Sequence, residues 1–456
     1  MDTICAVSTP HGMGGIAVIR VSGDDSIDIV QQRWRGMLLS DMASHTAHLG
    51  HVLDSHGEIL DEAVLTLFRA PNSFTGEDVV EISCHGSMWI QQQIVSSLID
   101  AGCRAAMGGE FTQRAFANGK IDLSQAEAIA DVIASQSRAS HHVAMNQMRG
   151  AFSRQLSTLR SQLLQFVSLI ELELDFSEED VTFADRSRLT NLAAYIKSVI
   201  DSLAQSYQAG NAIKNGLPVA IVGPTNAGKS TLLNTLLGDD RALVSDIKGT
   251  TRDVIEDTIV MGGTLIRFID TAGIRESSDV IESMGIKRSF KKMDEARIVL
   301  WVVDVTAPIS ELEEFYSQIK DHCQDKEVIV VVNKVDAGNS LPIINKHIDL
   351  DLTIVEISAK EGTGVEHLKE VIVDIAALPQ VNDENAVIVT NSRHYHALVR
   401  ASEALDRTLQ GLESSLSGDL LSQDIRECMH YLGEITGEIS TDDILGEIFS
   451  HFCIGK

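Results

Sequence analysis

VAIVGPTNAGKSTLLNTLL, residues 219–237, joins a short β-branched run, a glycine-rich loop and a stretch of helix-forming residues. The run Val219–Val222 is typical of a buried strand, and the residues after the loop are expected to form a helix. Between them, Gly223–Ser230 has the spacing GxxxxGKS. The glycines allow backbone N–H groups to close around phosphates, Lys229 suits the β- and γ-phosphates, and the Ser230 hydroxyl suits magnesium. The stretch therefore predicts an α/β nucleotide-binding domain.

Two segments further along the chain carry groups that suit magnesium and the γ-phosphate. Asp270-Thr271-Ala272-Gly273 follows an apolar run. There the Asp270 carboxylate would hold magnesium through water, and the Gly273 amide would contact the γ-phosphate. Between this element and the glycine-rich loop lies GTTRD, residues 249–253. We select Thr251 from it as a second hydroxyl ligand for magnesium.

Base recognition is predicted from two later segments. Asn333-Lys334-Val335-Asp336 ends the apolar run Glu327–Val332, and Ser358-Ala359-Lys360 follows another run. An aspartate carboxylate accepts both the N1–H and the exocyclic amine of guanine, and adenine offers neither donor in that geometry. Asp336 therefore predicts selectivity for guanine, with a backbone amide of the second segment supporting the base. Because strands and helices alternate here, we expect a parallel sheet with crossover helices.

The pattern of the chain changes on both sides of this segment. The first 120 residues mix alternating strands, helical patches and glycine-rich turns. A helical pattern runs from Ser124 to about Asp175, with a break expected near Gly150. Two polar joints, Gln205–Gly216 and Leu378–Asn385, bracket the α/β segment. The economical interpretation is an α/β domain inserted into an all-helical domain and preceded by an α+β domain. The limits are 1–120 for the α+β domain, 121–215 and 379–456 for the helical domain, and 216–378 for the inserted domain.

Composition and charge limit the partners. Of 456 residues, 37 are lysine or arginine and 65 are aspartate or glutamate, which gives a formal net charge of −28. Such a charge repels phosphate backbones and argues against extended, unaided binding of nucleic acid. The longest apolar runs are strand-length, no signal peptide is visible, and the six cysteines form no CxxC pair. We expect a soluble cytoplasmic protein without a membrane partner.

The motifs NAGKS, GTTRD and DTAGIRE resemble those of the translation-factor-like P-loop GTPases, although Ile274 stands where Ras-type switches carry a catalytic glutamine. Upstream, FTGEDVVEISCHG and GEFTQRAFANGKIDLSQAEAIAD are more specific. With the terminal CIGK they resemble the MnmE (TrmE) family of tRNA-modification GTPases over essentially the whole chain. The resemblance implies an N-terminal domain that binds tetrahydrofolate and dimerises, and a G domain inserted in a helical domain.

The family's activity would then be the activity of this chain. With the flavoprotein MnmG, a homodimer would add a carboxymethylaminomethyl (or aminomethyl) group at C5 of the wobble uridine of certain tRNAs. GTP hydrolysis would depend on K⁺ and Mg²⁺. A tetrahydrofolate derivative, 5,10-methylene or 5-formyl, would supply the one-carbon unit, and FAD would be on the partner. The acidic surface agrees with tRNA being bound mainly through the complex.

The resemblance also assigns residues around the nucleotide. Asn226, Ser245, Ile247 and Thr250 would hold potassium, which could neutralise charge as an arginine would. Glu282 would orient the attacking water, with Lys229 and Asp270 completing the catalytic set. From the residues alone, Asn226 also suits a turn, and Glu282 suits a solvated helix face. The GTP-binding set is Asn226, Ala227, Gly228, Lys229, Ser230, Thr231, Ser245, Asp246, Ile247, Lys248, Gly249, Thr250, Thr251, Asp270, Thr271, Ala272, Gly273, Asn333, Lys334, Asp336, Ser358, Ala359 and Lys360.

For the folate, the family's binding positions fall on Arg20, Glu81, Lys120 and Lys456. Cations suit a glutamyl tail or a formyl group, and a carboxylate suits pterin N–H donors. From the residues alone, each also suits an ordinary surface charge or ion pair. Cys453 matches the family's terminal cysteine as a possible functional thiol, and it also suits a small buried apolar position.

Two other functions share part of this pattern. A ribosome-assembly GTPase has the same nucleotide motifs but usually carries a basic RNA-binding appendage, which the net charge of −28 argues against. A stand-alone folate-dependent one-carbon transferase with a regulatory G domain would turn over methylene-tetrahydrofolate without the flavoprotein.

Overall fold

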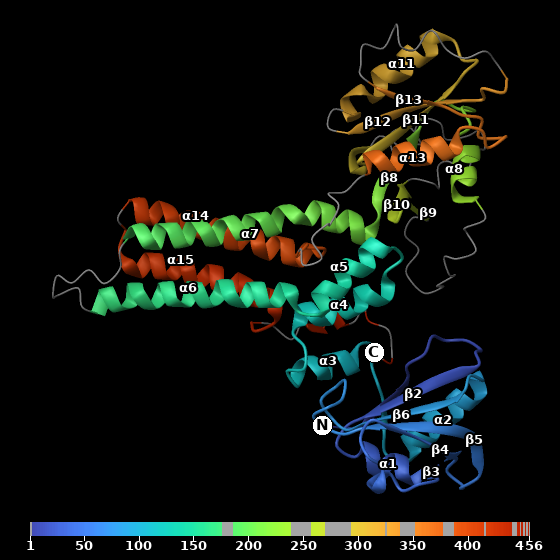
Figure 1. The fold of residues 1–456 in the computed structure, drawn as a ribbon, viewed down its shortest axis with the longest axis vertical. Coiled ribbons are helices and arrows are strands. Elements are labelled where there is room, and N and C mark those ends of the chain that lie inside the picture. The colour runs from blue at the N-terminus through green and yellow to red at the C-terminus, as the bar shows by residue number, and fades with distance from the viewer. Residues whose placement is uncertain are drawn as a thin grey trace. The chain divides into compact units, whose positions relative to one another are not determined.

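The structure is a computed structural model that separates into two compact units, each considered on its own (Figure 1). The first unit comprises Met1–Ile133, Met145–Ser198 and Ala397–Lys456, and the second comprises Ala134–Ala144 and Val199–His396. The described residues are 2–175, 186–238, 257–269, 293–323, 326–337, 352–376, 387–414, 416–439, 445–446, 448–449, 452 and 455. Among these residues, no helix is both long and apolar enough to cross a bilayer.

A seven-stranded sheet of order β3-β4-β5-β6-β2-β1-β7 forms the N-terminal part of the first unit. Its pairs are antiparallel except that β1 and β7 are parallel. Alternate residues of the strands are buried together with α1 and α2 in one core. The bounds are β1 Ile4–Val7, β2 Ile16–Ser22, α1 Ser26–Gln32, β3 Trp34–Arg35, β4 Thr46–Leu53, β5 Ile59–Phe68, β6 Val79–His85, α2 Met88–Asp100 and β7 Arg104–Ala105.

Long helices follow the sheet, as the helical pattern predicts. α6 and α15 lie side by side in the first unit (Figure 1). The bounds are α3 Glu110–Ala117, α4 Leu123–Ala134, α5 Arg138–Met148, α6 Ala151–Asp175, α7 Arg186–Asn215, α14 Ser392–Glu413 and α15 Gly418–Thr436. The break expected near Gly150 is confirmed, because this glycine separates α5 from α6 with a φ of 76°.

One predicted joint is wrong. α7 continues through Gln205–Asn215, so only Gly216 separates the helix from the next strand. The stretch is polar on one side only: Ala212 and Ile213 are buried. A Cβ added at Gly210 would lie 2.0 Å from the Val389 carbonyl oxygen, so the glycine permits a close approach of the chain here. The second predicted joint, Leu378–Asn385, lies outside the described residues.

The second unit contains a six-stranded sheet of order β13-β12-β11-β8-β10-β9. All its pairs are parallel except β9 with β10, which confirms the predicted parallel sheet. Residues of α8 and α13 share a core with one face of the sheet, and residues of α11 share a core with the other. The bounds are β8 Leu217–Val222, α8 Lys229–Leu237, β9 Asp257–Met261, β10 Thr264–Ile269, β11 Ile298–Asp304, α11 Ile309–Ile319, η4 Lys320–Cys323, β12 Glu327–Asn333, β13 Thr353–Glu356 and α13 Val365–Ile375.

The C-terminal tail contacts the beginning of the chain within the first unit. The Ser8 hydroxyl donates a hydrogen bond to the Gly455 carbonyl at 3.0 Å. Gly455 has a φ of 91°, and a Cβ added there would lie 2.2 Å from the Val7 carbonyl oxygen. Phe449 is buried with Leu123 of α4. Gly455 therefore lies against the end of β1, and Phe449 lies against the first turn of α4.

Candidate functional site

The five parallel strands β8, β10, β11, β12 and β13 end at one edge of the six-stranded sheet. In open α/β sheets this carboxyl edge is where ligands bind. The predicted phosphate loop leaves β8 there, and the two predicted base-recognition segments leave β12 and β13. The topology therefore gathers three of the five predicted nucleotide-binding elements.

The phosphate loop has a conformation that requires its glycines. Gly223 and Gly228 have φ values of 151° and 97°, which side chains rarely allow. A Cβ at Gly223 would lie 2.2 Å from the Val302 carbonyl oxygen, and one at Gly228 would lie 2.1 Å from Asn333 Nδ2. The loop is thus closed against β11 and β12. Asn226 also lies in the left-handed region, at φ 63°.

Lys229, the first residue of α8, turns its ammonium group back into this loop. Its Nζ donates to the carbonyl oxygens of Gly223 and Pro224, both at 2.7 Å. Burial lowers the pKa of this lysine, since a desolvated ammonium is less stable. A phosphate in the loop would bring a counter-charge to this ammonium group. Ser230 and Thr231 follow in the first turn of the helix, where an anion is favoured.

Asn333 connects the phosphate loop to both base-recognition segments. Its Nδ2 donates to the Ala227 carbonyl at 2.9 Å, and its Oδ1 accepts from the Ala359 backbone N–H at 2.9 Å. The side chain is 2% exposed, so both bonds are shielded from water. This one amide therefore fixes three loops from three strands relative to one another.

Asp336 is held in place by the neighbouring segment. The Ser358 hydroxyl donates to Asp336 Oδ1 at 2.6 Å. This hydrogen bond holds the pKa of Asp336 below its ordinary value, so the group is an acceptor-only carboxylate at neutral pH. Lys360, beyond Ala359, is exposed and lies 3.6 Å from Glu361. The arrangement can accept two hydrogen bonds from a planar ring with adjacent N–H groups.

A partner of Lys334 was missed by sequence reasoning. Lys334 Nζ lies 2.5 Å from Oδ2 of Asp304, the last residue of β11. The available signal was the change from an apolar run to an acid in RIVLWVVD. An acid at the end of an apolar run is also typical of any strand that ends in solvent, so this pattern does not identify Asp304 as the partner of Lys334.

Many predicted nucleotide-site residues lie outside the described residues, and their roles stay predictions. They are the loop residues Ser245, Asp246, Ile247, Lys248, Gly249, Thr250 and Thr251, the segment Asp270, Thr271, Ala272 and Gly273, and Glu282.

The predicted folate residues occupy the N-terminal sheet. Arg20 on β2 and Glu81 on β6 are cross-strand partners, with Nε and NH2 of the arginine 2.9 and 2.7 Å from Glu81 Oε1. The Arg20 guanidinium also lies over the rings of Phe74 and Phe111, 5.2 and 5.6 Å from their centroids. Arg20 and Glu81 thus satisfy one another, and the two rings enclose the guanidinium.

Lys120 lies beside the loop that carries Phe74. Its Nζ donates to the Pro71 carbonyl at 2.8 Å, and a Cβ at Gly76 would lie 3.2 Å from the Lys120 side chain. The loop between β5 and β6 therefore connects the surroundings of Lys120 with those of Arg20. Lys456 and Cys453 lie outside the described residues.

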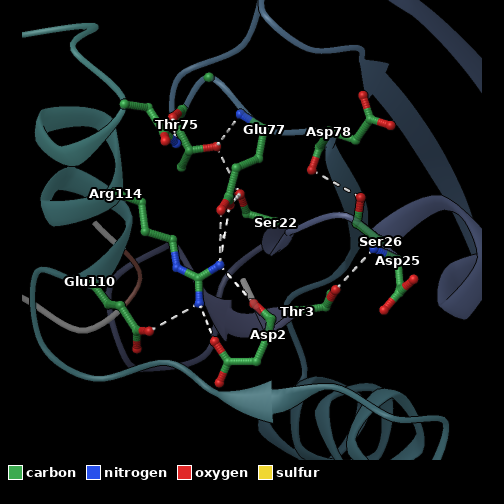
Figure 2. A network of polar contacts seen from close by, with 12 residues as sticks. Asp2, Thr3, Ser22, Asp25, Ser26, Thr75, Glu77, Asp78, Glu110 and Arg114 are labelled. Carbon is green, nitrogen blue, oxygen red and sulfur yellow. Dashed lines mark hydrogen bonds and ion pairs between the residues drawn. The ribbon is translucent and has the colours of Figure 1, made fainter.

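An ionic network around the buried side chains of Arg114, Glu77 and Glu110 fixes the base of that loop (Figure 2). Arg114 on α3 donates to Glu77 at 3.1 and 3.2 Å, to the Asp2 carboxylate and backbone carbonyl at 2.7 Å each, and to Glu110 at 3.2 Å. Ser22 adds a 2.7 Å bond to Glu77. Sequence reasoning missed this network because its members are separated by up to 112 residues. The spacing of Glu110 and Arg114 on one helix was the only local signal.

The sheet order, the glycine-dependent loop and the inward lysine define a P-loop nucleotide-binding domain. The sequence matches the family model described as "MnmE helical domain" over residues 123–453 and the one described as "GTP-binding protein TrmE N-terminus" over residues 3–120. The chain belongs to the MnmE family of tRNA modification GTPases.

Relatives named tRNA modification GTPase MnmE align along the full length. The protein of Parabacteroides distasonis is 54% identical and covers 100% of both chains. That of Flavobacterium johnsoniae is 50% identical over 100% of this chain and 99% of the relative.

Two solved GTPase structures match part of the chain. Era in complex with MgGDPNP and 16S ribosomal RNA is 34% identical over 41% of this chain and 66% of its own, with a TM-score of 0.28. The G domain of T. maritima FeoB is 23% identical over 35% of this chain and 98% of the FeoB chain, with a TM-score of 0.26.

Proposed function

We propose that this chain binds and hydrolyses GTP at the carboxyl edge of the six-stranded sheet. The observation that carries the proposal is the Asn333 bridge, which joins the loop shaped for phosphates to the Asp336 carboxylate held by Ser358. Ser230 offers magnesium a hydroxyl oxygen, the hard type of ligand that this ion prefers. Thr251 and Asp270 would complete the magnesium site, and Glu282 would orient the attacking water.

Lys229→Ala tests the phosphate assignment. It should abolish GTP hydrolysis because the only ammonium found inside the described loop is removed. Lys369→Ala is the matched control, since that lysine lies outside the phosphate loop and its ammonium group pairs with the exposed Glu366 on α13. If Lys229→Ala hydrolyses GTP as fast as Lys369→Ala does, the phosphates bind elsewhere.

Asp336→Asn tests the recognition of the base. An amide donates where the carboxylate accepts, so this variant should lose affinity for GTP and gain affinity for xanthosine triphosphate, whose C2 oxygen is an acceptor. Unchanged preference for guanine would remove Asp336 from base recognition.

Potassium would lie at the phosphate loop, with Asn226 as one ligand. Amide and carbonyl oxygens are the ligands that replace water around this ion, and Asn226 lies in the loop next to Ala227. Ser245, Ile247 and Thr250 would supply the others. Hydrolysis should be faster in potassium than in sodium, and Asn226→Ala should erase the difference. Equal rates of the wild type in both salts would refute the potassium site.

A tetrahydrofolate derivative would bind at the N-terminal sheet, on Arg20, Glu81 and Lys120, with Lys456 from the tail. Lys120 donates only to a backbone carbonyl among its described contacts, so its positive charge is available to a glutamyl carboxylate. Lys120→Ala should weaken binding of 5-formyl-tetrahydrofolate measured by calorimetry. Arg35→Ala, which removes an arginine bonded to the Gly57 carbonyl, is the control. Equal affinities of the wild type and Lys120→Ala for 5-formyl-tetrahydrofolate would exclude Lys120 from the folate site.

In this proposal the chain is a cytoplasmic homodimer that acts with the flavoprotein MnmG on C5 of the wobble uridine. Exposed Leu49 and Val64, cross-strand neighbours pointing away from α1 and α2, support pairing of two chains. Val64→Glu should then lower the mass measured by light scattering to that of a monomer.

Mass spectrometry of tRNA nucleosides tests the cellular role. Cells lacking the protein should lose the C5-modified uridine, and the wild type but not Lys229→Ala should restore it. An unchanged nucleoside profile would instead favour ribosome assembly, for which subunit profiles are the next measurement.

A further inference from the structure

The order of the strands determines what lies beneath a bound nucleoside. The phosphate loop follows β8, whereas Asp336 follows β12, and β11 lies between these two strands in the sheet. A nucleotide that reaches from Lys229 to Asp336 therefore crosses the end of β11. Its sugar and base must pass over whatever stands there.

Asp304 ends β11 at this crossing. It is in register with Asn333, the last residue of β12. Its Oδ1 accepts from the Thr306 backbone N–H at 2.9 Å and from the Thr306 hydroxyl at 2.8 Å, which leaves Oδ2 for Lys334 at 2.5 Å. Burial raises the pKa of Asp304, but the bonds from Lys334 and Thr306 outweigh burial and hold it below its usual range.

Lys334 reaches Asp304 because its backbone turns. A φ of 66° directs the chain away from the line of β12, and the side chain then extends to the neighbouring strand end. The four methylene groups of Lys334 thus span the interval between β12 and β11. An extended apolar stem of this kind is a surface on which a planar ring can lie.

We propose that Asp304 is a positioning residue for base recognition, which holds the stem of Lys334 across the end of β11 beneath the guanine of the bound nucleotide. This inference rests on the proposed GTP site. Without the pair, the lysine stem would have to be ordered when the nucleotide binds. Ordering one long side chain weakens binding about three- to tenfold.

Asp304→Asn isolates the pair with little change of shape. An amide at Oδ2 presents N–H donors to the ammonium group of Lys334, so the pair is lost while Oδ1 still accepts from Thr306. The matched control is Asp294→Asn, the same substitution at the opposite end of β11. Asp294 pairs with His322 at 2.8 Å and is half exposed.

The measurement is the dissociation constant of fluorescent methylanthraniloyl-GDP, with inosine diphosphate as a competitor. Asp304→Asn should weaken the binding of GDP about three- to tenfold, and Asp294→Asn should weaken it less than about twofold. Inosine lacks the exocyclic amine that Asp336 would accept, so Asp304→Asn should weaken inosine diphosphate by the same factor as GDP. A loss confined to GDP would place Asp304 in direct amine recognition and overturn the proposal.

A second variant separates positioning from a general effect on the fold. Lys334→Met keeps an apolar stem but cannot pair with Asp304. In that background Asp304→Asn should add less than about a twofold loss, because the interaction through which it acts is already absent. An equal loss in both backgrounds, or no loss in either, overturns the proposal. If the wild type itself fails to bind GDP, the GTP site is refuted and this inference falls with it.

Discussion

Replacement of Asn333 by alanine should destabilise the six-stranded sheet even without a nucleotide. The side chain makes two hydrogen bonds, one to the carbonyl of Ala227 and one from the N–H of Ala359. All three residues are buried, each at most 2% exposed. Alanine at this position leaves a carbonyl and an N–H without a partner and away from water.

The expected cost follows from those two groups. A buried polar group that loses its partner costs about 1–3 kcal/mol, so the two groups together should lower the free energy of unfolding of Asn333→Ala by about 2–6 kcal/mol. Asn333→Asp keeps the acceptor for Ala359 but turns a second acceptor toward the Ala227 carbonyl, so it should be destabilising as well. Asn215→Ala removes an exposed bond to Asn211 and should cost less than about 0.5 kcal/mol.

The assay needs a signal confined to this sheet, because a chain of several domains does not unfold in one step. Trp301 on β11 is fully buried against Phe315 and Tyr316. Trp34→Phe with Trp89→Phe leaves it as the single tryptophan of the three. Urea unfolding followed by its fluorescence compares the variants in this background. A loss below about 1 kcal/mol for Asn333→Ala, or one equal to that of Asn215→Ala, would refute the bridge as a stabilising element.

Three further predictions concern an arginine, two buried cysteines and an aspartate. Arg114→Met removes the arginine that pairs with the buried Glu77 carboxylate, whereas Glu110 keeps Arg104. The variant should destabilise the N-terminal sheet by about 3–5 kcal/mol, measured by urea unfolding with Trp34 as the only tryptophan; a loss within about 0.5 kcal/mol would contradict this reasoning. Burial raises the pKa of Cys84 to about 11 and that of Cys428 to about 12. Because the thiolate is the reactive form, iodoacetamide at pH 8 should leave both thiols unmodified until urea unfolds the chain. Modification of either cysteine in the native protein, found by peptide mass mapping, would disprove this prediction. Lys334 and Thr306 hold the pKa of Asp304 below its ordinary value of about 3.9. The contribution of the ionised carboxylate to stability is therefore complete above about pH 4 and is lost as the pH falls through the folded pKa. Asp304→Asn should reduce the acid dependence of the free energy of unfolding, and an identical dependence in both proteins would argue against the pair.

The sequence predicts the nucleotide-binding edge well because local patterns determine it. The apolar runs become β8 and β12 within a residue or two, and the helix expected from Thr231 begins at Lys229. A strand followed by glycines and a lysine can bind phosphate only if the loop closes, and the loop does close on Lys229. Short-range spacing is therefore enough for this half of the site.

Other features depend on contacts that spacing does not encode. Ser124 and Glu127 have capping-box spacing, yet Asp122 caps α4, accepting from the Gln125 N–H at 2.9 Å while Gln125 Oε1 accepts from the Asp122 N–H at 3.0 Å. Both pairs fit the rule, and tertiary context decides between them. The Arg114 network is the extreme case, since each of its charges resembles an ordinary surface ion in the sequence. The folate residues share that ambiguity, because Arg20 and Glu81 pair with one another in the described structure.

The contact between Ser8 and Gly455 joins positions 447 residues apart, and it sets an order of events during synthesis. Chains fold from the N-terminus while they are made, so β1 pairs with β2 long before residue 455 exists. The part of the chain around Ser8 that receives Gly455 must then stay open until residue 455 has been made. A chain truncated before residue 455 would still contain every strand of both sheets and would lack this contact. The hydrogen bond from Ser8 to Gly455 therefore forms later than the strand pairing on which it rests.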